Sequence, residues 1–173
     1  MHCCLKGNVT RVWTVKLKMI QNGLLLVILI CAISAYARAP ELPATIGTCM
    51  KSVDARLEID RRLNPFYLRG DFDGDGRRDY AVLVRRGTSR GIAICLAASP
   101  KAMTLGAGSA FHGMTDMDFT SWNVYEKRFV ERGVGEGSPP RLIGEAIRVE
   151  WEESASALIY WRNRKFLWYQ QGD

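Results

Sequence analysis

The sequence is poor in the side chains that most often carry catalysis or hold transition metals. Its 173 residues include only two histidines, and only His112 lies beyond the N-terminal region. No Cys-x-x-Cys pair occurs, which removes the usual spacing of a cysteine-based zinc or redox site. No internal repeat is present either, so an array of stacked repeats is excluded. Without the N-terminal region, any Ser-His-Asp arrangement would have to use His112.

Clustered positive charge is also lacking, although the whole chain has a formal net charge of +6. Residues 1–37 contain Lys6, Arg11, Lys16 and Lys18 and no acidic residue. Without them, 20 basic residues stand against 18 acidic ones, which leaves a formal charge of +2. The remaining arginines are interleaved with acids, whereas a nucleic-acid interface needs a basic face with stacking aromatics. The sequence therefore predicts no nucleic-acid partner.

Long apolar runs are limited to one, Leu24–Ile33. It is followed by Ala35-Tyr36-Ala37, a small-residue cleavage pattern, so residues 1–37 are predicted to be a signal peptide that is cleaved after Ala37. The run is shorter than the roughly 20 residues of a membrane span, and a permanent anchor stays the alternative. The true start stays open between Met1 and Met19, since the later start would discard the basic residues that a signal peptide uses.

Cleavage would leave two of the five cysteines, Cys49 and Cys95. In an oxidising compartment such a pair predicts a disulfide that closes a long loop. Two buried free thiols are the alternative, because a sequence does not show whether the Cα atoms come within bridging distance. We expect a periplasmic or secreted protein without a stable membrane anchor after cleavage, and residues 38–173 have the length of a single globular domain.

What the sequence does contain is an acidic loop that leads directly into the apolar segment Tyr80–Val84. Aspartates occupy loop positions one, three, five and nine, and a glycine lies at position six. Calcium takes six to eight hard oxygen ligands at roughly 2.3–2.6 Å, and alternating carboxylates around a glycine turn supply them. The predicted Ca²⁺ ligands are the side chains of Asp71, Asp73, Asp75 and Asp79 and the backbone carbonyl of Arg77.

An acidic turn without a metal is the alternative interpretation, because Asp and Gly mark turns in any case. Electrostatics favours the metal, since two like charges about 4 Å apart cost roughly 1 kcal/mol in water and about 4 kcal/mol at an effective dielectric near 20. Arginines flank the loop, but Arg77 and Arg78 fall between ligand positions, where side chains point outward. They cannot take the central place of a cation.

The loop resembles the calcium hairpin of FG-GAP and VCBS repeats, the units of integrin-type propellers. The resemblance rests on the Asp-x-Asp-x-Asp-Gly-x-x-Asp pattern of Asp71–Asp79 and on the strand pattern that follows it. An EF-hand would need a glutamate at position twelve, where this chain has Val82. The resemblance implies a structural calcium that makes a β-hairpin rigid, here over residues 66–86. Since one copy is present, a propeller is excluded, and the chain resembles small exported bacterial proteins that carry a single such hairpin.

Outside the loop, the apolar pattern has mostly the two-residue period of strands. In residues 147–152 apolar side chains alternate with charged ones, as in a sheet with one wet face. Ala155–Trp161 and Lys165–Tyr169 flank a polar turn and predict a hairpin. Tyr80–Arg85 and Gly91–Ala97 predict two further strands around a Gly-containing turn.

A short helix is predicted within Pro43–Leu57, ahead of the sheet, whereas Ala55–Leu63 fits a strand about as well as a helix. Gly133–Pro140 is predicted to be a loop, because it is rich in Gly and Pro. We therefore expect an α+β fold, a mainly antiparallel β-sheet with one N-terminal helix, in a single domain that is not a propeller.

The C-terminal segment is dense in aromatic residues, and these allow two interpretations. They fill a core, or they form a recognition face for a protein or glycan. Because side chains on a hairpin alternate between faces, they cannot all point inward. The residues are Tyr160, Trp161, Phe166, Trp168 and Tyr169.

The function favoured by these features is that of an exported, non-enzymatic calcium-binding module, in which the metal stabilises a β-hairpin. Its expected partner is an unidentified envelope or extracellular protein or glycan. The alternative is a periplasmic hydrolase of cell-wall or glycan material that uses His112. This alternative needs His112 in a pocket beside a carboxylate and a hydroxyl.

Overall fold

The computed structural model describes residues 42–99, 101–134, 137–152 and 155–172. The chain divides into two units, Met1–Leu42 and Pro43–Asp173, and all helices and strands described below belong to the second unit. The predicted signal peptide lies outside the described residues. Within the described ranges, no helix has the length and apolar character needed to cross a membrane.

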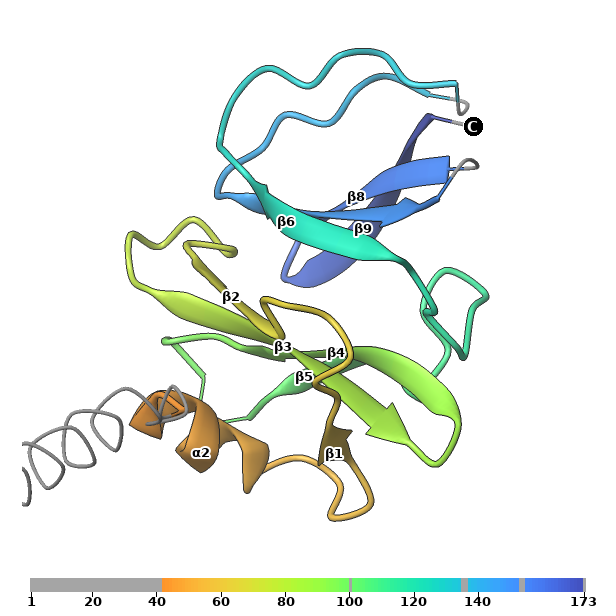
Figure 1. The fold of residues 1–173 in the computed structure, drawn as a ribbon. Coiled ribbons are helices and arrows are strands. Elements are labelled where there is room, and N and C mark those ends of the chain that lie inside the picture. The colour runs from red at the N-terminus through yellow and green to blue at the C-terminus, as the bar shows by residue number, and fades with distance from the viewer. Residues whose placement is uncertain (1–41, 100, 135–136, 153–154, 173) are drawn as a thin grey trace, which may run out of the picture. The chain divides into compact units, whose positions relative to one another are not determined.

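One short helix and nine strands make up the described part of the second unit (Figure 1). Their bounds are α2 (Ala44–Met50), β1 (Glu58–Ile59), β2 (Tyr67–Gly70), β3 (Asp79–Arg86), β4 (Ser89–Cys95), β5 (Met103–Gly106), β6 (Ser121–Tyr125), β7 (Ala146–Trp151), β8 (Ala155–Arg162) and β9 (Lys165–Gly172).

The first sheet contains β1 to β5, and its pairings are antiparallel. β3 is the central strand, because it pairs with β4 along one edge and with β1 and β2 along the other. Residues Ala81–Val84 of β3 are all buried, as expected for a strand that is covered on both faces. A turn at Gly87, where φ is +59°, joins β3 to β4 and confirms the predicted strand pair.

The second sheet is a meander in which β6, β7, β8 and β9 each pair antiparallel with the next. At the turn between β8 and β9, Asn163 and Arg164 have φ values of +53° and +62°, which is typical of a two-residue type I′ hairpin. The predicted C-terminal hairpin is thus confirmed. In β7, Ile147 and Val149 are fully buried, and the alternation seen in the sequence is that of a strand with one face in the core.

The main core lies between the two sheets, which are stacked in Figure 1. Buried side chains of β2, β3 and β4 form one cluster with side chains of β6, β7, β8 and β9. Phe72 and Phe119, from loops that precede β3 and β6, belong to this cluster and have no exposed surface. The described residues form two antiparallel sheets with one short helix and no closed barrel, which confirms the expected α+β fold.

Helix α2 covers the other face of the first sheet near β4, and it is shorter than the predicted segment. It ends at Met50, where the Ser52 hydroxyl donates a hydrogen bond to the Cys49 carbonyl. The ambiguous segment Ala55–Leu63 contains the short strand β1 rather than more helix. A disulfide joins Cys49 to Cys95 with the Cα atoms 5.8 Å apart, which confirms the predicted pair. It ties the helix to the end of β4 and closes a separation of 46 residues, worth roughly 4 kcal/mol of loop entropy.

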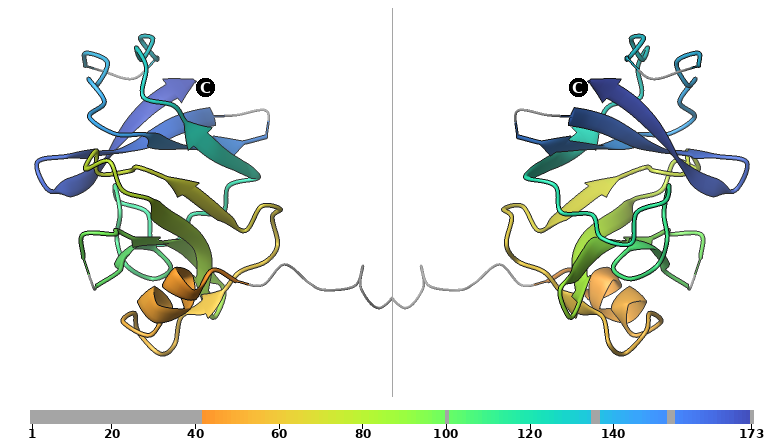
Figure 2. Two further views of the ribbon diagram at one scale, coloured as in Figure 1. Left: turned by 90° about the vertical axis from the view of Figure 1, so that its left-hand side faces the viewer. Right: turned by 90° about the vertical axis from the view of Figure 1, so that its right-hand side faces the viewer.

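The outer face of the second sheet is covered by the described residues of the β6–β7 loop, 126–134 and 137–145 (Figure 2). Tyr125 and Tyr169 of the sheet pack there with Val130 and Leu142 of the loop. As predicted, Gly133–Pro140 contains no helix or strand in its described residues.

The C-terminal aromatics divide between the two faces of the second sheet. Trp161, Phe166 and Trp168 contact the core between the sheets, whereas Tyr160 and Tyr169 belong to the outer cluster under the loop. Phe166 and Tyr169 are buried and the other three are half-buried. This distribution favours the core interpretation, because none of the five is among the exposed large apolar side chains of the described residues.

Candidate metal centre

The acidic loop closes the β2–β3 hairpin. The antiparallel register places Gly70, the last residue of β2, opposite Asp79, the first residue of β3. The chain therefore leaves one strand just before the first aspartate and enters the next strand at the last one. Strands flank the loop on both sides, as its sequence predicts.

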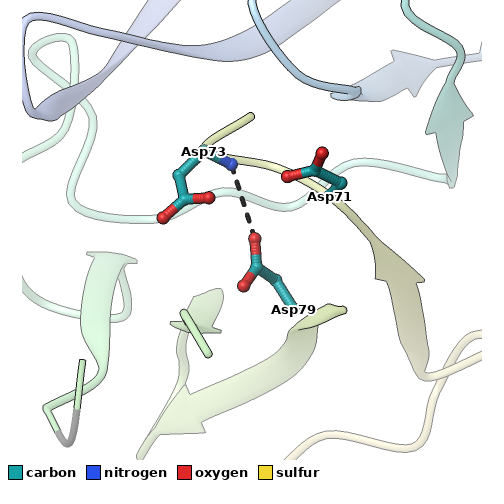
Figure 3. A group of neighbouring side chains, drawn as sticks. All are labelled: Asp71, Asp73 and Asp79. Atoms are coloured by element: carbon teal, nitrogen blue, oxygen red, sulfur yellow. Dashed lines mark hydrogen bonds between the residues drawn. The ribbon is translucent and has the colours of Figure 1, made fainter. Parts of the chain in front are cut away.

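Three of the four predicted carboxylates come together. Asp71, Asp73 and Asp79 each offer a carboxylate oxygen, and these oxygens all lie within 4.8 Å of one another (Figure 3). Oxygens that share one calcium ion at roughly 2.3–2.6 Å are at most about 5 Å apart, so the observed spacing fits a common cation. Asp79 is fully buried, and the other two are half-buried.

The loop's own backbone orients the first two carboxylates. Asp71 accepts hydrogen bonds from the amides of Gly74 and Gly76, at 2.9 Å and 3.1 Å. Asp73 accepts one from the amide of Asp75 at 3.1 Å. Gly74 and Gly76 have φ values of +78° and +83°, a region that side chains other than glycine rarely adopt. The glycines thus allow the turn that brings the amides to the carboxylates.

Asp79 connects the loop to the first sheet. Its Oδ2 accepts hydrogen bonds from the amides of Phe72 and Asp73 at 2.8 Å and 3.4 Å, and its Oδ1 accepts one from the amide of Ala97 at 2.7 Å. Burial raises the pKa of Asp79 above its ordinary value, and these backbone hydrogen bonds oppose that shift. The carboxylate is therefore a structural acceptor whether or not a metal is present.

Asp75 does not join the cluster. Its carboxylate is turned toward Arg77, whose Nε donates to Oδ2 at 2.8 Å and whose Nη2 lies 2.6 Å from the same oxygen. The side-chain hydrogen bond from Arg77 is the main cause that lowers the pKa of Asp75. The predicted ligand set is thus present in the loop, but one of its carboxylates is paired with an arginine.

The fifth predicted ligand, the Arg77 carbonyl, accepts no hydrogen bond from any residue that the structure describes. That oxygen is not already committed to another protein donor. Asp71, Asp73, Asp79 and this carbonyl together form a set of hard oxygen donors, which suits calcium better than a transition metal.

Charge within the cluster is poorly compensated by protein. The pKa of Asp73 is raised, first by burial and then by the charges of Asp75 and Asp71. Among ion pairs between described residues, none involves Asp71, Asp73 or Asp79. The cluster therefore has the charge of a cation site, and its residues fit calcium.

Glu145, which was not among the residues predicted from the sequence, is hydrogen-bonded to the acidic loop from a different part of the chain. The Asp71 amide donates to Glu145 Oε2 at 2.6 Å, and the Glu145 amide donates to the Asp71 carbonyl at 2.7 Å. Gly144 lies so close to the loop that an added Cβ would meet the Gly74 nitrogen at 2.6 Å. These contacts bridge 74 residues of sequence, and no local spacing rule signals them.

His112 lies away from this centre, in the tight turn where Phe111 and Met114 pair. It is exposed, and its ring stacks on Trp168 with centroids 5.3 Å apart and an interplanar angle of 12°. Within the described part of the chain, no side chain hydrogen-bonds to its imidazole. The hydrolase alternative needs a carboxylate and a hydroxyl that engage this histidine, and neither is hydrogen-bonded to it among those residues.

Comparisons with known protein families, with curated proteins and with solved structures find no match to this chain. The likeness to FG-GAP and VCBS hairpins therefore rests on the acidic loop alone.

Proposed function

We propose that this chain is an exported, non-enzymatic calcium-binding module whose metal stabilises the β2–β3 hairpin and whose role is to bind another envelope or extracellular component. The main support for a bound metal is that the carboxylates of Asp71, Asp73 and Asp79 converge, and that none of them forms an ion pair with a described basic residue. Bound calcium would supply the missing positive charge.

The structural role follows from where the ligands sit. Asp71 and Asp73 lie at the start of the loop, while Asp79 begins β3. A cation held by all three would fasten the two ends of the loop to each other. Through the two hydrogen bonds between Asp71 and Glu145, it would also fasten the segment that leads into β7. The metal would thus tie together parts of both sheets.

Export is supported by the disulfide and by the apolar leader pattern in the sequence. Cys49 and Cys95 are bonded, and such bonds persist mainly in oxidising compartments. Calcium is abundant outside the cytoplasm, where a module that needs the metal for its stability would stay loaded. A periplasmic or secreted location is therefore part of the proposal.

The test is thermal unfolding of the purified protein in EDTA and across a calcium titration. A ligand that binds only the native state stabilises by RT ln(1 + [L]/Kd), about 2.7 kcal/mol at a hundredfold excess over Kd. We expect the melting temperature to rise with calcium and to respond much less to magnesium, which demands a tighter octahedral site. An Asp73→Asn variant should respond weakly. A wild-type protein whose melting temperature ignores calcium would reduce the loop to an acidic turn.

A further inference from the structure

Exposed large apolar side chains are concentrated on one segment of the described chain, the β6–β7 loop. Phe129, Val134 and Ile143 are exposed by 82%, 63% and 45%, and all three lie on this loop. Isolated exposed apolar residues are common on protein surfaces, but their collection on a single loop points to an interaction site.

The loop has two arms, residues 126–134 and 137–145, which run beside each other over the second sheet (Figures 1 and 2). A hollow of about 430 Å³ lies between them, within the range of small binding sites. Both arms line it, one with four consecutive residues and the other with another four. The lining consists of Lys127, Arg128, Phe129, Val130, Pro139, Pro140, Arg141 and Leu142.

The walls of this hollow are held in place before anything binds. Val130 and Leu142 are 1% and 6% exposed, because their side chains pack on the outer face of the second sheet. The Tyr169 hydroxyl accepts a hydrogen bond from the Gly133 amide at 2.9 Å. At the other end, Glu145 is fixed to the acidic loop. A preformed wall lowers the ordering cost of binding.

The chemistry of the lining is apolar and positively charged. Its three ionic residues are Lys127, Arg128 and Arg141, and it contains no acidic residue. The guanidinium of Arg128 lies 4.5 Å from the ring centroid of Tyr125, so this charge is held at the sheet surface beside the hollow. Such a site fits an apolar group that is flanked by negative charge.

We propose that the hollow between the arms of the β6–β7 loop binds an acidic peptide segment of a partner protein, with one large apolar side chain inserted beside Phe129 and acidic neighbours paired with Lys127, Arg128 and Arg141. A concave, two-walled hollow suits an inserted side chain, whereas a membrane surface would require apolar groups that protrude together. The inference rests on the proposed function only in treating the chain as a binding module.

The experiment uses the calcium-loaded protein as bait for a randomised peptide library. Enriched peptides are then labelled with fluorescein and their affinity is measured by fluorescence anisotropy. We expect enrichment of sequences with an aromatic or large aliphatic residue between acids. Binding should weaken as salt rises, since the paired charges are near the surface.

Matched variants locate the site. Phe129→Ser should weaken peptide binding roughly tenfold or more, as for a central anchor residue, whereas Val134→Ser, which alters an exposed apolar residue outside the hollow, should not. Arg141→Glu should also weaken binding, while Arg162→Glu, at the exposed end of β8, is its control. Phe129 is highly exposed, so its replacement leaves folding intact.

Several outcomes would overturn the proposal. These are a library without enrichment, enriched peptides that lack acids, or affinity unchanged by Phe129→Ser. Two further outcomes would overturn it because another ligand would occupy the hollow. One is sedimentation with vesicles of phosphatidylcholine and phosphatidylglycerol in place of peptide binding, which would identify a membrane surface. The other is dimerisation that Phe129→Ser abolishes, which would identify a second copy of the chain. The calcium titration of the melting temperature is repeated on the same samples. Loss of the calcium response with peptide binding kept would contradict the metal site alone, and the reverse would contradict the peptide site alone.

Discussion

The two loops that carry the proposals are stabilised in opposite ways. The acidic loop between β2 and β3 is organised by polar contacts, because Asp71, Asp73 and Asp79 accept hydrogen bonds from loop amides. The β6–β7 loop is organised by apolar packing of Val130 and Leu142 on the second sheet. They meet at Gly144 and Glu145, where the second loop contacts the first.

This difference has a consequence for stability and for function. The stability of a polar loop with converging charges depends on pH and on cations, because its like charges repel when no cation is bound. The stability of a loop held by apolar packing depends on neither pH nor cations. Such a loop can also leave Phe129 exposed, because other side chains anchor it. Calcium sensitivity should therefore belong to the first loop, and partner contact to the second.

The largest effect is expected for Asp79→Ala, which removes the polar anchor of the acidic loop. The variant leaves the buried amide of Phe72 without its acceptor and removes the partly buried hydrogen bond of the Ala97 amide, and an unsatisfied buried group costs about 1–3 kcal/mol. We expect a loss of about 3 kcal/mol in urea unfolding, in EDTA as well as in calcium. Asp75→Ala is the control, since Asp75 pairs only with exposed Arg77 and its loss should change little in EDTA. Similar losses for both variants would contradict the anchoring role of Asp79.

A somewhat smaller effect is expected for Leu142→Ala, which tests the apolar anchor of the β6–β7 loop. Leu142 is buried among Val130, Tyr125 and Tyr169, and truncating a buried leucine costs at least about 2 kcal/mol. Phe129→Ala, on the same loop but exposed, should stay within about 0.5 kcal/mol of wild type. Urea unfolding of both variants separates the two positions. If Leu142→Ala were as mild as Phe129→Ala, the loop would not be held by its packing.

The acidic loop and the strands on its two sides were predictable from sequence, because alternating Asp and Gly residues ahead of an apolar segment form a local pattern. The same local logic predicted the β8–β9 and β3–β4 hairpins, in which a short turn joins strands with a two-residue period. The pairing of Asp75 with Arg77 was not predicted, although the residues are two apart, since ligand spacing says nothing about which rotamer an arginine adopts.

Long-range features were not predictable in this way. Glu145 approaches Asp71 across 74 residues, and only the stacking of the two sheets brings them together. β5 and β6 are short strands without a distinctive pattern, and β5 becomes recognisable through its pairing with β4. The β6–β7 loop covers the second sheet through a few apolar residues. These residues lie in or beside a Gly- and Pro-rich segment, and that composition predicts a loop without showing where the loop packs.

The contact between the loops can be tested by Gly144→Ala. An added Cβ would meet the Asp71 carbonyl and the Gly74 nitrogen, which are backbone atoms that cannot move aside easily. We expect a cost of about 1–3 kcal/mol, as for overpacking, together with weaker calcium stabilisation. Gly47→Ala is the matched control, because nothing lies within 4 Å of its added Cβ and alanine favours the helix. A calcium response that is unchanged in Gly144→Ala would show that the two loops are independent.

The smallest and most diagnostic effect is expected for Asp73→Asn, because its sign should depend on calcium and on pH. The folded protein raises the pKa of Asp73 through burial and the charges of Asp75 and Asp71. A group with a raised folded pKa contributes stability that is fully present below its unfolded pKa of about 3.9 and is lost as pH rises through the folded value. In EDTA, Asp73→Asn should therefore match wild type at acid pH and become more stable than wild type toward neutral pH. The gain should be only a few tenths of a kcal/mol, because solvent screens the charge of a half-buried group.

In calcium at neutral pH the order of stability should reverse, because wild type keeps the charged ligand. Melting temperatures of both proteins across pH, with and without calcium, test this, and an order that calcium does not reverse would contradict Asp73 as a ligand.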